Sequence, residues 1–128
     1  MSYYFARKFQ AGFEEAIERI TASLKKEGFG VLTTINVRET LKNKLGVDFR
    51  NYIILGACNP PYAYKALQAE DKIGTMLPCN VIVQELGEGI VEVAAIDPVA
   101  SMQAVENKKL EGTALEVQAK LKRVIESL

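Results

Sequence analysis

The chain has 128 residues, of which 48% are hydrophobic and 25% charged, a balance typical of one folded globular domain. Sixteen basic side chains match sixteen acidic ones, so the chain lacks the basic excess with which proteins bind nucleic acid through its phosphates. The sequence contains no histidine, which excludes Ser-His-Asp and Cys-His catalytic groups and histidine-based metal sites within one chain.

Apolar spacing divides the first half of the chain into three strand–helix pairs. Alternating or uninterrupted apolar residues predict strands over residues 2–9, 29–35 and 51–58. Helical spacing predicts helices over 12–27, between Asn36 and Gly46, and over 60–69. Two of these helices have clear start signals, because Asn36 and Glu39 form a capping box and Asn59 precedes a proline as an N-cap.

The second half predicts a hairpin followed by two helices. Strands over 80–86 and 90–96 flank Gly87-Glu88-Gly89, a sequence that favours a tight antiparallel turn. Asp97-Pro98 begins a short helix that continues to Val105, and Thr113 with Glu116 forms a capping box that opens the last helix. The order β-α-β-α-β-α-β-β-α-α predicts a single α+β domain over 1–128, with two layers: an antiparallel sheet of about five strands and helices packed on one face.

Nothing in the sequence indicates export or a membrane. The N-terminal residues lack a basic start followed by a long apolar stretch, and no run approaches the ~18 apolar residues of a membrane helix. We therefore expect a cytoplasmic protein with no membrane partner and no nucleic-acid partner. Its two cysteines are expected to be reduced thiols, because a domain of this size needs no disulfide.

Both cysteines occur in a Cys-Asn dipeptide beside proline at the edge of an apolar run. Cys58-Asn59 ends the predicted strand 51–58 and precedes a helix, whereas Cys79-Asn80 follows Pro78 at the start of the strand 80–86. If these two strands are neighbours in the sheet, the two thiols approach each other. The pair is therefore the first candidate for a functional site.

The residues around these dipeptides suggest a pocket for a small molecule. Amides at strand ends can orient a small polar ligand, and side chains of the following helix can line the same pocket. The alternative is purely structural: two core cysteines, a helix cap, a turn residue and a tyrosine at a boundary or dimer interface. The candidate ligand-binding residues are Cys58, Asn59, Tyr62, Tyr64, Lys65, Cys79 and Asn80.

A second hypothesis uses the thiols themselves. Cys58 precedes a helix, and the positive end of the helix dipole favours a reactive thiolate, although Pro60 and Pro61 remove two N–H donors there. Cys58 and Cys79 of one chain could bind Cu(I), or four thiols of a dimer could bind zinc. Their separation, from position 58 to position 79, is not a zinc motif, and no other cofactor is predicted.

The same elements carry a resemblance to a known family. Cys58-Asn59-Pro60 and Leu77-Pro78-Cys79-Asn80 are its most specific parts, and the similarity extends over residues 48–60, 63–67 and 73–83 to Val91, Val93 and Asp97-Pro98. Across most of its length the chain resembles the family called Domain of Unknown Function 302. The resemblance implies a small bacterial or archaeal protein with a TATA-binding-protein-like antiparallel sheet backed by helices, and a homodimer. It implies no established activity.

These observations favour a small-ligand-binding or interaction module over an enzyme. The preferred site is the neighbourhood of the two Cys-Asn dipeptides. The alternative function is a thiol-dependent redox enzyme or a soft-metal protein that binds copper or zinc.

Overall fold

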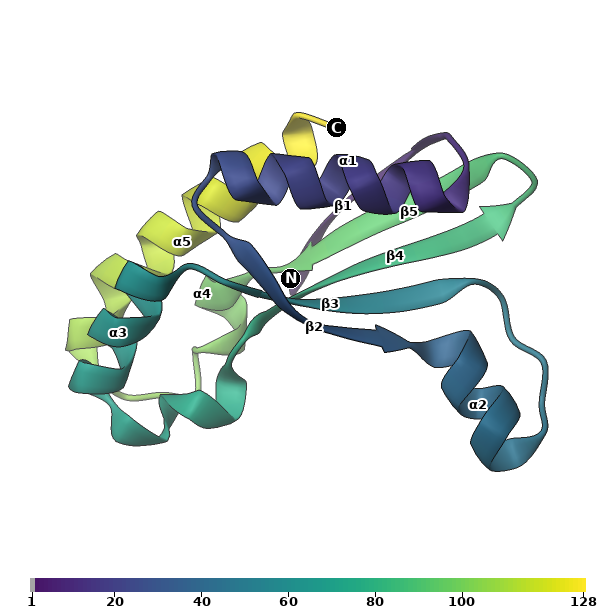
Figure 1. Cartoon of the computed structure of the whole chain (residues 1–128). Helices are drawn as coiled ribbons and strands as arrows, with labels where there is room; N and C mark the ends of the chain where they lie inside the picture. The colour runs from purple at the N-terminus through teal and green to yellow at the C-terminus, as the bar shows by residue number, and fades with distance from the viewer. Residues whose placement is uncertain (1) are drawn as a thin grey trace.

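The computed structural model describes residues 2–128, which form a five-stranded sheet with helices (Figure 1). All neighbouring strands are antiparallel, in the order β1-β5-β4-β3-β2. The strands are β1 (Tyr4–Gln10), β2 (Gly30–Asn36), β3 (Tyr52–Cys58), β4 (Cys79–Gly87) and β5 (Ile90–Ile96). The helices are α1 (Phe13–Lys26), α2 (Val37–Leu45), α3 (Pro60–Ala69), the 3-10 helix η1 (Asp71–Met76), α4 (Pro98–Ser101) and α5 (Lys108–Glu126).

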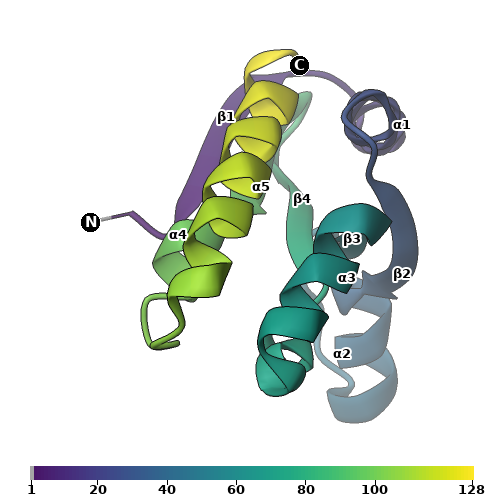
Figure 2. The same cartoon turned by 90° about the vertical axis from the view of Figure 1, so that its left-hand side faces the viewer.

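Helices α1 and α5 lie side by side on one face of the sheet and enclose the main core (Figures 1 and 2). Alternate residues of each strand point to this face, as the strand period of two requires. These strand residues pack against the apolar side of each helix, so the residues whose spacing predicted the helices are those that form the core. Fully buried members of this core are Ile20, Leu24, Val81, Val83, Val91, Val93 and Leu121.

The remaining helices lie at the two ends of the sheet. Helix α3, η1 and α4 gather where β3 ends and β4 begins, and α3 packs against α5 (Figures 1 and 2). Helix α2 lies at the other end of the sheet and has no buried residue. Its main contacts are with β2 and β3. The α+β fold with an antiparallel sheet is therefore confirmed, and a smaller core joins Ala66, Ile73 and Leu110 beneath α3.

Several local predictions are confirmed by the hydrogen bonds of the structure. The Asn36 side chain accepts from the Glu39 N–H at 3.0 Å, and the Asp97 carboxylate accepts from the Val99 N–H at 3.0 Å. The hairpin turns through Gly89, whose φ of 74° is a conformation that glycine adopts without strain. No helix within residues 2–128 is long and apolar enough to cross a membrane.

The last part of the chain differs from the prediction. Helix α5 begins at Lys108, so the Thr113 capping box was wrong and Thr113 lies inside the helix. The cap is Asn107, whose oxygen accepts from the Lys109 N–H at 3.0 Å while its amide donates to the Ala69 carbonyl at 2.8 Å. Helix α4 ends at Ser101 and does not continue to Val105. The bond to Ala69 joins residues far apart in the chain and could not be foreseen from local sequence.

Candidate functional site: an apolar cavity at the end of the sheet

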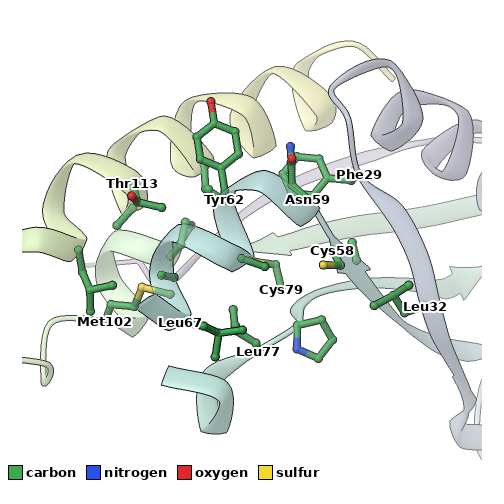
Figure 3. A pocket seen from close by; sticks show the side chains of 18 residues that line it. Phe29, Leu32, Cys58, Asn59, Tyr62, Leu67, Leu77, Cys79, Met102 and Thr113 are labelled. Atoms are coloured by element: carbon green, nitrogen blue, oxygen red, sulfur yellow. The ribbon is translucent and has the colours of Figure 1, made fainter. Parts of the chain in front are cut away.

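A cavity of about 280 Å³ lies between α3, α5 and the adjoining ends of β3 and β4 (Figure 3). Its walls are almost entirely carbon, and two of its leucines, Leu32 and Leu67, are 68% and 43% exposed. The cavity is therefore open to solvent rather than sealed in the core. Its larger apolar wall residues are Phe29, Leu32, Leu67, Leu77, Met102 and Leu110.

Small side chains explain why space remains at this place. Ala63 and Ala66 of α3 face the cavity, as do Ala57 of β3 and Ala114 of α5. An alanine methyl group fills little of the gap between a helix and its neighbour, and protein interiors otherwise pack without such voids. The spacing of Ala63 and Ala66 along α3 was visible in the sequence, but nothing there indicated that Ala114 would lie across from them.

The two cysteines line this cavity together. Cys58 is the last residue of β3, Cys79 is the first residue of β4, and Ala57 pairs directly with Cys79 across the two strands. Both thiols are free, half-buried and part of the cavity wall (Figure 3). The condition set for this prediction holds, because β3 and β4 are adjacent, and both cysteines line the same cavity.

The Cys79 thiol is held in its neutral form. Burial raises the pKa of Cys79 from an ordinary value of 9.0 to about 11, with a smaller contribution from neighbouring Cys58. Only the thiolate is a strong nucleophile, so Cys79 at neutral pH acts as a small apolar wall residue.

The raised pKa predicts slow alkylation of Cys79. In the wild type, with the peptide that carries Cys79 quantified by mass spectrometry, iodoacetamide should label Cys79 of the folded protein at pH 8 about a hundredfold more slowly than Cys79 of the protein unfolded in urea, because two pKa units reduce the thiolate fraction by that factor. The logarithm of the rate should keep rising with pH up to about 11. Equal rates in folded and unfolded protein would contradict the buried position of Cys79.

The same shift has a consequence for stability. Because the folded pKa lies above the unfolded one, the contribution of Cys79 is fully present below pH 9 and is lost as the pH rises to about 11. The free energy of unfolding of the wild type should therefore fall, relative to a Cys79→Ala variant, by about 1 kcal/mol per pH unit in this window.

Asn59 holds the start of α3 in a different way from the prediction. It occupies the N-cap position, but its side chain makes no cap hydrogen bond. Its Nδ2 instead donates to the Glu27 carbonyl at 3.1 Å, which ties α3 to the turn after α1. This turn passes through Gly28, with φ of 89°, where a Cβ would lie 3.2 Å from the Asn59 Nδ2. The prediction of a side-chain cap was wrong because Pro61 has no N–H to donate and the Tyr62 N–H donates to the Asn59 backbone carbonyl instead.

The other predicted site residues divide into two groups. Tyr62 lines the cavity, together with Cys58, Asn59 and Cys79. Tyr64, Lys65 and Asn80 are exposed and do not line it. Helical geometry turns positions 64 and 65 away from the side of α3 that carries Tyr62, and strand alternation turns Asn80 to the face opposite Cys79.

The metal hypothesis has a limited set of donors. Within residues 2–128, no group of three or more Cys, Asp or Glu side chains is placed to hold a metal ion. The sulfur atoms of the cavity wall belong to Cys58, Cys79 and Met102 (Figure 3).

Comparisons with known proteins agree with this fold. The comparison with curated proteins found no match. Among solved structures, the chain is similar to the crystal structure of an uncharacterized conserved protein DUF302 from Bacillus stearothermophilus, with 30% sequence identity, a TM-score of 0.89 and coverage of 98% of each chain. The sequence pattern of the family described as "Domain of unknown function DUF302" matches residues 5–128. The chain therefore belongs to the DUF302 family.

Proposed function

We propose that this protein binds a small, mainly apolar molecule in the cavity between α3 and α5. The observation that supports it is an open cavity with carbon walls at the end of the sheet. A volume of about 280 Å³ is near the lower end of ligand pockets. At ~30 Å³ for a water-sized group, it accommodates about nine non-hydrogen atoms.

The position of the cavity also supports a binding role. Ligand pockets are mostly apolar, with a few polar groups that set orientation, and here those groups are Asn59, Tyr62 and Thr113. The exposed Leu32 and Leu67 give a ligand access without unfolding of the core. A neutral Cys79 thiol in the wall suits an apolar ligand better than redox exchange, which needs a thiolate.

A thermal-shift titration tests this function. Binding to the folded state must raise the melting temperature with ligand concentration, so 1-hexanol and 1-octanol at millimolar concentrations should raise it relative to methanol. The same plate should contain Zn²⁺ and, under reducing conditions, Cu⁺. A shift with the metals and none with the alcohols would overturn apolar-ligand binding in favour of the soft-metal alternative.

We also propose that two copies of the chain associate through the sheet face that α1 and α5 leave uncovered. Antiparallel sheets with one solvated face normally carry polar residues there. Here the half-buried or exposed residues on that face include Ile35, Ile54, Ile82 and Ala94. The centre of this face has no helix over it in Figure 1.

Size and charge favour a second copy as the occupant of this face. Five strands of about seven residues, at ~3.4 Å per residue and ~4.8 Å per strand, give a face of roughly 570 Å² per copy, or about 1,100 Å² for two, just above the ~1,000 Å² expected of a specific interface. Its polar end carries both signs: Arg50 Nε donates to Gln84 at 2.8 Å, and Gln84 donates to Glu92 at 2.9 Å. A surface with both charges complements itself across a two-fold axis.

Charge introduced at the centre of this face tests the dimer. We expect Ile54→Glu to halve the mass measured by light scattering, because it buries an unpaired carboxylate in the interface. The edge variant Ile35→Glu, at a side chain 48% exposed, should weaken association with less risk to folding. The control is Thr21→Glu, which adds the same charge at an exposed position of α1 and should leave the mass unchanged. A wild-type chain that is monomeric at high concentration would refute the proposal.

A further inference from the structure

The polar groups of the cavity lie along one border. Tyr62 and Thr113 lie where α3 meets α5, and Asn59 lies at the start of α3, whereas Leu32 and Leu77 lie on the opposite side (Figure 3). The cavity therefore has an apolar body and one border at which the few polar side chains gather. An occupant that satisfies both parts must itself be amphiphilic.

Two hydroxyl groups at this border have no hydrogen-bond partner among residues 2–128: those of Tyr62 and Thr113. Thr21, which is also inside a helix, shows the usual arrangement, because its hydroxyl donates to the Ile17 carbonyl at 2.7 Å. Neither Tyr62 nor Thr113 is fully buried, and no fully buried side-chain polar atom of the described residues is left unsatisfied. Both hydroxyls are thus available to a ligand group at the rim of the cavity, because the Tyr62 hydroxyl points away from Leu77 and Leu32 (Figure 3).

The charges beside this border are mainly positive. The Nζ atoms of Lys65 and Lys120 lie 5.6 and 5.8 Å from the centroid of the Tyr62 ring. Lys120 and Arg123 share the Glu27 carboxylate: the Lys120 Nζ lies 3.9 Å and the Arg123 Nη2 lies 3.0 Å from the Glu27 Oε1. Lys65 has no carboxylate within 4.0 Å among the described residues. Two ammonium groups therefore lie beside the Tyr62 ring, and the one of Lys65 has no carboxylate partner among the described residues, which leaves a local positive potential.

We infer that the ligand is a small amphiphile with one carboxylate and an apolar body of about seven carbon atoms. This inference rests on the proposed function and adds the chemistry of the head group. The apolar body occupies the space between Leu32, Leu77 and Met102. The carboxylate accepts hydrogen bonds from the hydroxyls of Tyr62 and Thr113 and lies in the field of Lys65 and Lys120.

Three ligands with the same eight-carbon chain test the head group: octanoate, 1-octanol and octylammonium. In calorimetric titrations at pH 7 and low salt, octanoate should bind about fivefold tighter than 1-octanol, and octylammonium should bind weakest. If none of the three binds, the proposed function itself fails. If 1-octanol or octylammonium binds as tightly as octanoate, the cavity binds apolar chains but the carboxylate inference is overturned.

Two variants identify the residues responsible. Lys65→Gln removes an exposed charge outside the cavity wall and should lower octanoate affinity about threefold while leaving 1-octanol unchanged. Lys44→Gln on the distant α2 removes the same charge and should change neither affinity. Thr113→Val keeps the side-chain shape and should weaken octanoate binding without changing the preference for chain length. If Lys65→Gln and Lys44→Gln lower octanoate affinity equally, the carboxylate does not bind beside Tyr62 and Lys65, and the inference is overturned.

Discussion

The substitution Ala63→Phe is expected to abolish ligand binding while the protein remains folded. Ala63 lies in the cavity wall on α3, and a phenyl ring in its place adds six carbon atoms to a space for about nine. A ligand would lose the burial of most of its chain, at about 0.8 kcal/mol for each CH₂ group. The affinity for 1-octanol should fall at least about a hundredfold, as measured by calorimetry.

Stability separates this effect from misfolding. Because the ring enters existing space, the melting temperature of Ala63→Phe without ligand should equal or exceed that of the wild type. The control is Ala22→Phe, which adds the same ring at an exposed position of α1 and should leave affinity unchanged. Undiminished binding of 1-octanol by a folded Ala63→Phe protein would place the ligand outside this cavity.

The second large effect is expected for Gly56→Ala, in the middle of β3. A Cβ at this position would lie 2.8 Å from the Pro78 Cγ and in direct conflict with the Thr33 hydroxyl. The proline ring cannot turn away as a long side chain can, so the neighbouring strands must separate. Overpacking of this kind costs about 1–3 kcal/mol, which urea denaturation should detect as a lower midpoint with an unchanged slope.

Gly87→Ala is the matched control for this substitution. Gly87 is also in a strand, but a Cβ there meets nothing within 4 Å, and its φ is not positive. Alanine restricts the unfolded chain more than glycine does, so Gly87→Ala should leave stability unchanged or raise it slightly. If both variants lose the same free energy of unfolding, the close packing of Gly56 against Pro78 is not the cause.

Local sequence patterns predicted most of the fold. All five strands, the Asn36 and Asp97 caps and the hairpin before Ile90 were predicted within a few residues of their observed positions. These features depend on side-chain period and on bonds between residues close in the sequence, and both can be recognised in one segment. The Cys-Asn dipeptides were also correctly placed at a strand end and a strand start.

The predictions that failed depended on distant partners. Asn59 was expected to cap α3, but its amide binds the Glu27 carbonyl, and Asn107, which caps α5, also donates to the Ala69 carbonyl. An asparagine side chain can bond either to the helix that follows it or to a carbonyl of another segment. The sequence does not show which other segment will lie beside it. Thr113 was assigned to a helix start because it forms a capping-box pattern with Glu116, whereas it lies inside α5 at the cavity border.

The sequence by itself determined the α+β class, the order of the elements and the location of both thiols at strand ends. Only the tertiary structure decided that these thiols share a cavity with Ala63, Met102 and Thr113. The physical reason is that the spacing of apolar residues determines which side of a helix or strand faces the core. It does not determine how far apart the inward-facing sides of two helices lie. That distance depends on packing between segments far apart in the chain, and here small residues on α3 and α5 leave a space open.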